Sequence, residues 1–496
     1  METISLAQKE RMNGHSLKQR IDREDYVIGP NFDYPRILTE GGNLAYLAKR
    51  YPHFDFNSIA STRIPTLNEP EGIQIKGNSQ KIELRDTHGN AFYLFLKVGW
   101  KGDTPNDISY SQTMPPEESV KYQYDQMLFW REAGLRTPLA LGYFTVAHRG
   151  FEKHYLLMDF LMGNSLDIDL LALRKSQSYL KTPEAKIRHS AKVHEFQKIL
   201  TNEKNELIES GVRVIGDFFT QGTLHLDEKI KIEPSFSVYS PHNRQKHYGL
   251  QRSQHYFERL LKFLFKIPEM KISHAKRKSF SQNEFSGIIK HFLAPLLDES
   301  RDVYILGDAY PNNLRGGPGS NGVKLSYLID AERTMMGHPA HDLTRFLNSH
   351  LIELTLGEEA DFVSRAYDSH ADFLKSHGLD KAEFLREYFL LSFITRLSDM
   401  GRRASDDPKM NKQNRFPPRE RGYDYHQSMI HFPEPSDIAP RSVGYPSVSD
   451  SIVTQRKSLQ DRFSGMLEKR VNLPLEKEDV LSIGKLSEFL QSCGIV

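Results

Sequence analysis

The sequence is poor in cysteine, and Cys493 is the only one among its 496 residues. A single cysteine cannot form a disulfide within the chain, and a cysteine-type zinc site needs several thiolates. A disulfide-stabilised fold and a cysteine-bound zinc ion are therefore excluded. The composition fits a reducing compartment such as the cytoplasm.

Long apolar segments are also missing. No run of eighteen apolar residues occurs, so we expect no membrane span and no membrane partner. The first twenty residues are polar and charged, and they lack the apolar core of a signal peptide. We therefore expect a soluble cytoplasmic protein.

An excess of charge of either sign is absent as well. Lys and Arg number 66 and Asp and Glu number 64, so the net charge is only +2. A dedicated nucleic-acid-binding protein usually shows a basic bias, and we expect no nucleic-acid partner. The apolar share of 38% suffices for a large core, and the length suggests two to four structural units. These numbers do not indicate an oligomeric state.

The first third of the chain has the pattern of a β-sheet. Apolar alternation and apolar runs predict five strands, at 72–77, 80–86, 91–100, 139–146 and 153–161. The turn residues Thr87–Asn90 join the second and third strands as a hairpin. A helix is expected over 115–135, because Pro115 and Pro116 suit its first turn and Gly134 suits its end.

The rest of the chain has mainly helical spacing. We expect helices near 43–51, over 190–208 and 253–266, from 342 to about 403, and at about 453–470 and 477–492. Two short strands are expected at 303–306 and 323–329. An irregular stretch is expected at about 210–250, and the prolines and serines of 413–450 predict a linker or an extended arm.

Polar residues crowd at the ends of the two short strands. Asp308, Asn312 and Asn313 follow the first strand, and Asp330 follows the second. Asp and Asn disfavour strand interiors, so these residues mark where the strands end. The predicted hairpin turn at 315–322 places the two strand ends side by side, and the polar residues would then face one site.

This set of residues suits the transfer of a phosphoryl group from ATP to a hydroxyl. Such a reaction needs a carboxylate that aligns the nucleophile, and it needs oxygen ligands for Mg²⁺. Asp308 would be the catalytic base, and Asn313 and Asp330 would hold the metal. As the alternative, the same residues are ordinary turn formers.

The stretch "LGDAYPNNL", followed by "LIDAERTMMGHPAHDLTRFL", resembles the aminoglycoside phosphotransferase and choline kinase-like family. The resemblance implies an α+β, two-lobed protein-kinase-like fold, with a β-sheet N-lobe and a mainly helical C-lobe. It assigns Asp308 and Asn313 to the catalytic loop and Asp330 to the next metal-binding motif. It also implies that ATP and Mg²⁺ bind between the lobes.

The resemblance extends upstream to a nucleotide site. Lys97 in "FLKV" corresponds to the phosphate-binding lysine, and the backbone from Asp159 to Leu161 corresponds to the hinge that faces adenine. Gly77, Asn78 and Ser79 stand where the family has its nucleotide loop. As an ordinary alternative, Gly-Asn is a common turn.

The acid that pairs with Lys97 is open. Glu118 is favoured, while Gln123 falls at the expected spacing and Asp125 lies two residues further on. A first-turn acid such as Glu118 also suits the helix dipole without any role in nucleotide binding.

Two positions depart from the family's catalytic loop. Leu306 replaces its first histidine and Tyr310 its second. Further on, Asp342 is expected to cap a helix and to tie that helix start to the catalytic loop. The pair His338 and His341 suggests a metal site, but it lacks a third ligand, and helix capping is the preferred interpretation.

We expect an N-terminal extension at 1–61, an N-lobe at 62–160, a C-lobe at 161–412 with an insertion near 205–290, and a Pro-rich arm with C-terminal helices at 413–496. The predicted function is an ATP-dependent phosphotransferase that acts on a hydroxyl of a small molecule, such as a sugar, an amino alcohol or an aminoglycoside. The alternatives are a nucleotide-binding pseudokinase with a regulatory or scaffold role, and an enzyme of this fold that transfers AMP.

Overall fold

The structure is a computed structural model. It describes Leu38 and residues 43–63, 80–98, 116–148, 151–161, 163–189, 192–232, 253, 256, 260, 282–317, 325–349, 351–406 and 448–492. These residues form two compact units. Unit 1 holds the described residues up to Arg131 and those of Thr137–Met162, and unit 2 holds Glu132–Arg136 and the described residues from Gly163 onward.

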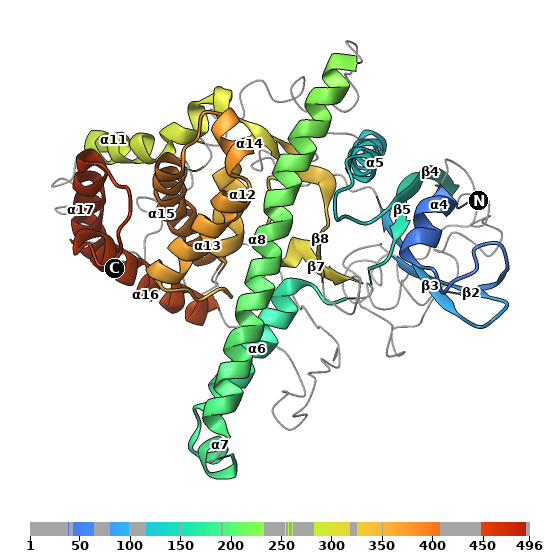
Figure 1. Ribbon diagram of the computed structural model, residues 1–496, viewed down its shortest axis with the longest axis horizontal. Coiled ribbons are helices and arrows are strands. Elements are labelled where there is room, and N and C mark those ends of the chain that lie inside the picture. Colours follow the sequence, from blue (N-terminus) through green and yellow to red (C-terminus); the bar gives the residue numbers. More distant parts are fainter. Residues whose placement is uncertain are drawn as a thin grey trace, which may run out of the picture. The chain divides into compact units, whose positions relative to one another are not determined.

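Unit 1 is built on a five-stranded antiparallel sheet (Figure 1). Its strands are β1 (Ile59–Arg63), β2 (Gln80–Asp86), β3 (Ala91–Val98), β4 (Ala140–His148) and β5 (Phe151–Asp159), in the spatial order β1-β2-β3-β5-β4. The helices α4 (Asn43–Arg50) and α5 (Pro116–Glu132) complete the unit. The strands predicted from residue 80 onward and both predicted helices are confirmed, and the predicted strand at 72–77 lies outside the described residues.

The strand β1 was not predicted from the sequence. Its segment IASTR holds only two apolar residues, and its last four residues are exposed, so no alternation of buried and exposed residues identifies it. It pairs with β2, and β2 pairs with β3 through the predicted hairpin, in which Gly89 has a φ of +82°. A positive φ is readily adopted by glycine, which explains why the turn contains one.

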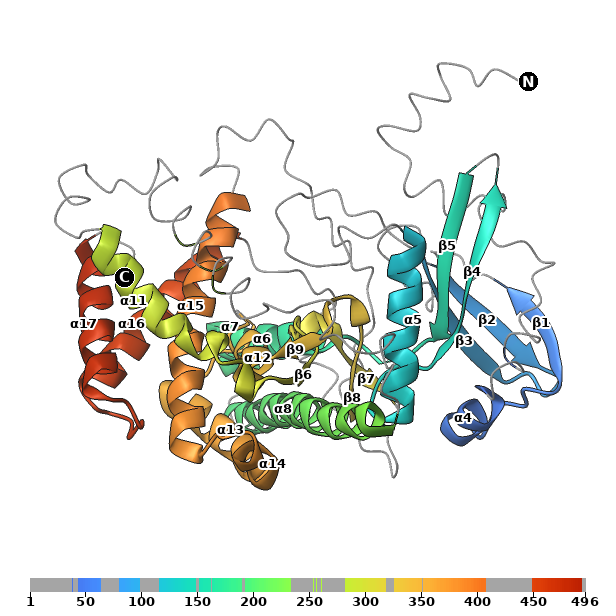
Figure 2. The same ribbon diagram turned by 90° about the horizontal axis from the view of Figure 1, so that it is seen from above.

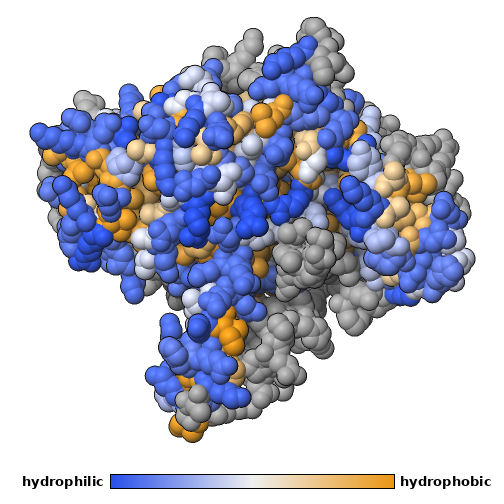
Figure 3. Space-filling view, in the orientation of Figure 1, coloured by the Kyte–Doolittle hydropathy of each residue, from blue (hydrophilic) through white to orange (hydrophobic). Residues whose placement is uncertain are grey.

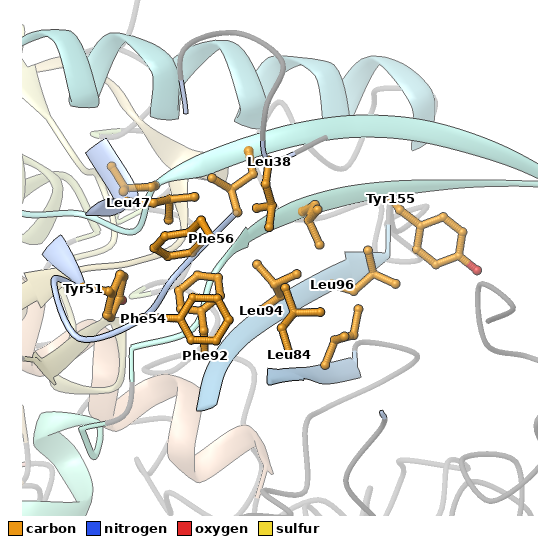
Figure 4. Close-up of a cluster of buried hydrophobic side chains, with 14 residues drawn as sticks. Leu38, Leu47, Tyr51, Phe54, Phe56, Leu84, Phe92, Leu94, Leu96 and Tyr155 are labelled. Carbon is orange, nitrogen blue, oxygen red and sulfur yellow. The ribbon is translucent and has the colours of Figure 1, made fainter. Parts of the chain in front are cut away.

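The core of unit 1 lies on one face of the sheet. The fourteen buried residues drawn in Figure 4 form it, and Leu38, Leu47, Tyr51, Phe54 and Phe56 among them precede β1 in the chain. Phe54 and Phe56 contact the ring of Phe92, with centroid distances of 5.5 and 5.0 Å. The segment before β1 is therefore an integral part of this core and packs directly on the sheet.

Unit 2 is mainly helical (Figures 1 and 2). Its longer helices are α6 (Leu166–Leu180), α7 (Pro183–Arg188), α8 (Val193–Ile232), α11 (Gln282–Leu293), α12 (Pro339–Leu347), α13 (Leu356–Ser369), α14 (Ala371–Ser376), α15 (Lys381–Asp406), α16 (Val448–Leu467) and α17 (Lys477–Ser492). Two short antiparallel ladders complete it, one between β6 (Val303–Ile305) and β9 (Met335–Gly337), the other between β7 (Leu314–Gly317) and β8 (Leu325–Leu328).

The helix α8 corrects the expectation of an irregular stretch from about 210, because it continues to Ile232. Three glycines in this part of the sequence resemble helix breakers, but the structure uses them for close packing. A Cβ atom at Gly211 would lie 2.3 Å from the ring of Phe346, and one at Gly222 would lie 2.5 Å from the ring of Tyr304. The glycines thus cost helix propensity and allow α12 and β6 to approach α8.

The two C-terminal helices predicted at 453–470 and 477–492 are confirmed as α16 and α17. They pack against α15 and α11. Phe463 of α16 stacks on Phe393 of α15 with a centroid distance of 5.0 Å, and Phe489 of α17 lies 5.6 Å from Phe285 of α11. The proline- and serine-rich segment between α15 and α16 lies outside the described residues, apart from its last few positions.

The predicted α+β fold class is confirmed, since a β-sheet unit is followed along the chain by a mainly helical unit. None of the described helices has the length and hydropathy that a bilayer-spanning segment requires. The surface shown in Figure 3 is mostly hydrophilic. An apolar area lies at α7, which carries Ile187, the most exposed of the large apolar side chains described, at 81%.

Candidate active site

The loop that carries Asp308 begins directly after β6, a strand whose three residues are all buried. The long helix α8 holds this strand, because the hydroxyl oxygen of Thr223 accepts the backbone N–H of Tyr304 over 2.8 Å. Gly307 then reverses the chain with a φ of +76°. A Cβ atom there would lie 2.4 Å from the backbone oxygen of Arg333, so both the conformation and the space require glycine.

Asp308 and Asn313 are held together within this loop. The side-chain amide of Asn313 donates to the backbone oxygen of Asp308 over 2.8 Å, and it lies 3.5 Å from the carboxylate oxygen Oδ2. A single 3₁₀ turn, Pro311–Asn313, provides the spacing, and the backbone N–H of Asn313 donates to the oxygen of Tyr310. The Asp308 side chain is 19% exposed, and Arg333 lies 3.5 Å from its Oδ1.

Asp330 stands at the end of β8, next to this loop. The backbone N–H of the preceding Ile329 donates to the backbone oxygen of Asn313 over 2.9 Å. Asp330 has a φ of +74° and is one of two described non-glycine residues with a positive φ. Such a conformation costs free energy in a residue with a side chain and persists where surrounding contacts impose it, often at functional sites. The structure therefore brings Asn313 into contact with the strand end that carries Asp330.

The donor atoms at this position suit Mg²⁺, which prefers oxygen ligands from one or two side chains together with phosphates. The amide nitrogen of Asn313 is engaged by Asp308, so its side-chain oxygen, which accepts from the amide of Asn312 over 3.3 Å, is the atom that could bind a metal. Among the described residues, no group of three or more His, Cys, Asp or Glu side chains could hold a metal by itself. Asn313 and Asp330 could each offer a side-chain oxygen to such an ion.

Asp342 of α12 holds the backbone at the start of the Asp308 loop. Its two carboxylate oxygens accept the backbone N–H groups of Leu306 and Gly307 over 2.7 and 3.0 Å. Burial raises the pKa of the Asp342 carboxyl to about 7, and the two N–H donors act against this rise. The predicted tie between this helix start and the loop of Asp308 is confirmed.

The prediction that Asp342 caps the helix is wrong, because His338 is the N-cap of α12. Its Nδ1 accepts the backbone N–H of Ala340, and its Nε2 lies 2.8 Å from the carboxylate of Glu387. The other histidine of this motif, His341, lies 3.3 Å from the hydroxyl of Tyr256. The two histidines have separate partners, in agreement with the preference for capping over a metal site.

Two contacts of the loop were missed from the sequence. The guanidinium group of Arg333 approaches Asp308, and the hydroxyl of Tyr310 donates to both carboxylate oxygens of Asp399 over 3.1 and 3.3 Å. Asp399 lies 89 residues after Tyr310 in the chain. No local pattern signals such a contact, although the substitution of the family's histidine by Tyr310 marked the position as unusual.

Lys97 lies on the face of the sheet in unit 1 that is opposite to the core. Side chains alternate along a strand, and Phe92, Leu94 and Leu96 of β3 face the core cluster. Phe95 and the half-buried Lys97 therefore share the other face. The ammonium group of Lys81 on the neighbouring β2 lies there too, 3.9 Å from the ring centroid of Tyr93. This second lysine was not predicted.

The segment Asp159–Leu161, predicted as the hinge beside adenine, lies at the end of β5. The carboxylate of Asp159 is buried and bound by Arg50, Tyr51 and the backbone N–H of Leu139 over 2.6–2.9 Å, so its side chain is structural. The N–H of Phe160 donates to Tyr93, and Leu161 is buried.

Other predicted positions cannot be placed at a site. Glu118 lies on α5, but its side chain is outside the described residues, as are Gly77, Asn78 and Ser79. Of the two other candidates for the partner of Lys97, Asp125 contacts Lys121 over 3.1 Å and Gln123 is buried. The acid that pairs with Lys97 stays a prediction.

Comparison with known proteins identifies one family. Residues 243–378 match the model of the phosphotransferase enzyme family, and this segment includes Asp308, Asn313, Asp330 and Asp342. The resemblance predicted from the motifs is confirmed over these residues. No curated protein matches the chain.

Several solved structures resemble the chain remotely. Plasmodium vivax ethanolamine kinase has 10% identity and a TM-score of 0.36, with 79% of this chain and 89% of that chain covered. An aminoglycoside phosphotransferase from Alicyclobacillus acidocaldarius has 12% identity and a TM-score of 0.37, with 89% and 96% covered. Spectinomycin phosphotransferase in complex with ADP and spectinomycin has 13% identity and a TM-score of 0.33, with 83% and 97% covered. Likenesses at these values are too remote to carry an argument about function.

Proposed function

We propose that the protein is an ATP-dependent phosphotransferase that acts on a hydroxyl group of a small molecule. The observation that carries the proposal is the loop at Asp308. Its amide partner Asn313 touches both this loop and the strand end of Asp330, and Asp342 fixes the loop through two backbone hydrogen bonds. The match of residues 243–378 to the phosphotransferase enzyme family supports the same activity.

Asp308 is the proposed catalytic base. Its carboxylate would accept the proton of the acceptor hydroxyl while the hydroxyl oxygen forms a bond to the γ-phosphorus of ATP. The bond from that phosphorus to the bridging oxygen breaks, and ADP leaves. The partly exposed position of Asp308, in a loop whose backbone is held at both ends, provides the fixed geometry that this alignment requires.

Asn313 and Asp330 are the proposed metal ligands. When bound, Mg²⁺ would neutralise charge on the transferring phosphate. The contact with Asp308 occupies the amide nitrogen of Asn313, whose oxygen accepts from Asn312 over 3.3 Å, and Asp330 has a positive φ at the neighbouring strand end. Both residues are thus positioned by backbone contacts of the loop and the strand end.

Lys97 is proposed to meet the phosphates, with the backbone from Asp159 to Leu161 beside the base. The support comes from unit 1 itself. Lys97 shares a sheet face with Phe95, whose ring lies 6.2 Å from that of Phe160 at the end of β5. An aromatic surface beside a lysine suits a nucleotide, whose base stacks and whose phosphates are anionic. Glu118 and the segment Gly77, Asn78 and Ser79 are proposed as further parts of this site.

The proposal is tested by ATP turnover across a panel of sugars, amino alcohols and aminoglycosides. The native protein is compared with Asp308→Asn, which keeps the shape of the side chain, and with Asp361→Asn, which changes an exposed carboxylate on α13. We expect acceptor-dependent release of ADP that the first variant abolishes and the second retains. Binding of ATP, measured by calorimetry, should persist in both.

Two outcomes would contradict the proposal. If the native protein binds ATP but turns over no acceptor, the pseudokinase alternative stands, although no observation on the structure favours it. If the acceptor gains the mass of a nucleotide instead of a phosphate, the chemistry is AMP transfer.

A further inference from the structure

A set of polar side chains, half-buried at Tyr310 and buried at the other members, leads from the loop of Asp308 to the helix α16. We call it the buried polar chain. Its members are Tyr310, Arg345, Asp399, Arg396, Glu359 and Arg462. They come from five separate elements of unit 2, namely the loop and the helices α12, α15, α13 and α16.

The buried polar chain begins at the ring of Tyr310, which leaves the loop two residues after Asp308. Its hydroxyl donates to Asp399 and accepts a hydrogen bond from the guanidinium group of Arg345. That guanidinium lies over the rings of Tyr310 and Tyr256, at 5.1 and 5.7 Å from their centroids. Arg345 is also close enough to Asp308 for the carboxylate to favour the charged form of the arginine.

The middle of the buried polar chain lies on α15. Arg345 and Asp399 form an ion pair with an N–O distance of 3.9 Å, and Arg396 stands one helical turn before Asp399. Both acidic groups next to Arg396 are buried. Asp399 interacts electrostatically with it, and Glu359 of α13 accepts from its guanidinium over 3.2 Å.

The buried polar chain ends on α16. Arg462 forms an ion pair with the same carboxylate oxygen of Glu359, and the hydroxyl of Ser458 accepts from Arg396 over 3.1 Å. Burial lowers the pKa of Arg396 to about 10 and that of Arg462 to about 9. Buried charges are stable only when they are paired, so the removal of one member leaves its neighbours uncompensated and disturbs their positions.

We propose that α16 is part of the catalytic apparatus, in that Ser458 and Arg462 act as positioning residues for the loop of Asp308. They fix Arg396 and Glu359, α15 then presents Asp399 at a set position, and Asp399 with Arg345 holds Tyr310. The kinetic part of this inference rests on the proposed function. The structural part, a coupling between α16 and the loop, does not.

The structural part is tested by amide hydrogen exchange in a peptide spanning residues 304–314, measured on the full-length protein without substrates. Ser458→Ala removes one hydroxyl, Arg462→Lys keeps the charge and loses the planar group, and Tyr310→Phe removes the loop's own anchor. The matched control is Arg386→Lys, because Arg386 joins α15 to α17 through Asp479 over 2.6 and 3.1 Å.

We expect exchange in the loop peptide to accelerate at least about threefold in the three test variants and to stay unchanged in Arg386→Lys. In Tyr310→Phe, the further change Ser458→Ala should have no additional effect on the loop, because the anchor is already lost. Loop exchange that is unaffected by Ser458→Ala and Arg462→Lys, or equally accelerated by the control, would overturn the proposal. Ser458→Ala keeps the test valid if Arg462→Lys does not fold.

The kinetic part of the proposal is tested by steady-state kinetics, once an acceptor is known. The same variants should lower kcat by about threefold or more and leave the KM for ATP unchanged, whereas the control should change neither. Equal losses of kcat in Arg462→Lys and Arg386→Lys would show a general loss of structure and would contradict a positioning role. If no acceptor is turned over at all, the proposed function fails, and hydrogen exchange still decides the coupling.

Discussion

The side-chain amide of Asn313 donates a hydrogen bond to the backbone oxygen of Asp308 over 2.8 Å. The change Asn313→Asp keeps the shape and offers an oxygen ligand, but it replaces the donor by a carboxylate oxygen that faces the backbone oxygen. We expect the phosphotransferase rate to fall at least about tenfold and the free energy of unfolding to fall by about 1 kcal/mol. The matched control is Asp361→Asn, at an exposed position of α13 away from this loop. Equal rates for Asn313→Asp and the native protein would contradict the role of this contact.

Asp342 accepts two buried backbone N–H groups, and Asp342→Ala would leave both without an acceptor. Each unsatisfied buried donor costs about 1–3 kcal/mol, so we expect a loss of at least about 2 kcal/mol in the free energy of unfolding. Urea denaturation followed by circular dichroism measures it. Asp361→Ala, at an exposed position of α13, should stay within about 0.5 kcal/mol of the native protein.

Gly307 combines a positive φ with contact to the backbone of Arg333, so Gly307→Ala should destabilise the protein by more than about 1 kcal/mol. The control is Gly287→Ala within α11, where a Cβ atom meets nothing within 4 Å. That change should stabilise the protein by up to about 1 kcal/mol, because alanine has the higher helix propensity. Thermal unfolding of both variants gives the comparison, and equal shifts in Tm would refute the argument.

Asp479 predicts a dependence of stability on pH. Its hydrogen bonds with Arg386, Glu476 and His291 hold the pKa of its carboxyl below the ordinary value of 3.8, although burial acts to raise it. Because the folded protein binds this proton less tightly than the unfolded chain, the stabilisation is present above pH 3.8 and is lost as the pH falls through the lower folded value.

The change Asp479→Asn should therefore cost about 2 kcal/mol at pH 7 and progressively less below pH 4. Denaturation curves at a series of pH values measure the difference. Glu478→Gln, at the exposed neighbouring position, serves as the control. A difference between Asp479→Asn and the native protein that does not shrink in acid would show that the contacts do not depend on the charge.

Local patterns in the sequence predicted most of the elements. Alternation and turn residues identified β2, β3 and their hairpin, and helical spacing identified α5, α16 and α17. The irregular stretch predicted from about 210 was wrong, since α8 continues to Ile232. Its glycines show one difficulty, because a glycine that ends a helix and one that admits a neighbouring ring look the same in sequence. The polar strand β1 was missed since its residues carry no apolar alternation.

A local pattern also predicted the polar loop of the site, because Asp308, Asn313 and Asp330 follow directly on apolar strands. The residues that hold this loop could not be found in this way. Asp399 reaches Tyr310 across 89 positions, and Arg462 reaches Glu359 across more than a hundred. Such contacts depend on how the helices of unit 2 pack, and no short motif records that packing.

The helix α16 follows α13 and α15 in the chain, and this order has a consequence for biosynthesis. Until α16 and α17 leave the ribosome, the nascent chain carries Phe393 on α15 without Phe463, and Glu359 without Arg462. At ordinary elongation rates this interval lasts roughly ten seconds. During that time an apolar helix face and a carboxylate destined for the interior are open to water. We therefore expect the helical unit to bind chaperones or to aggregate more readily before α16 and α17 have emerged than after they have packed on α15 and α11.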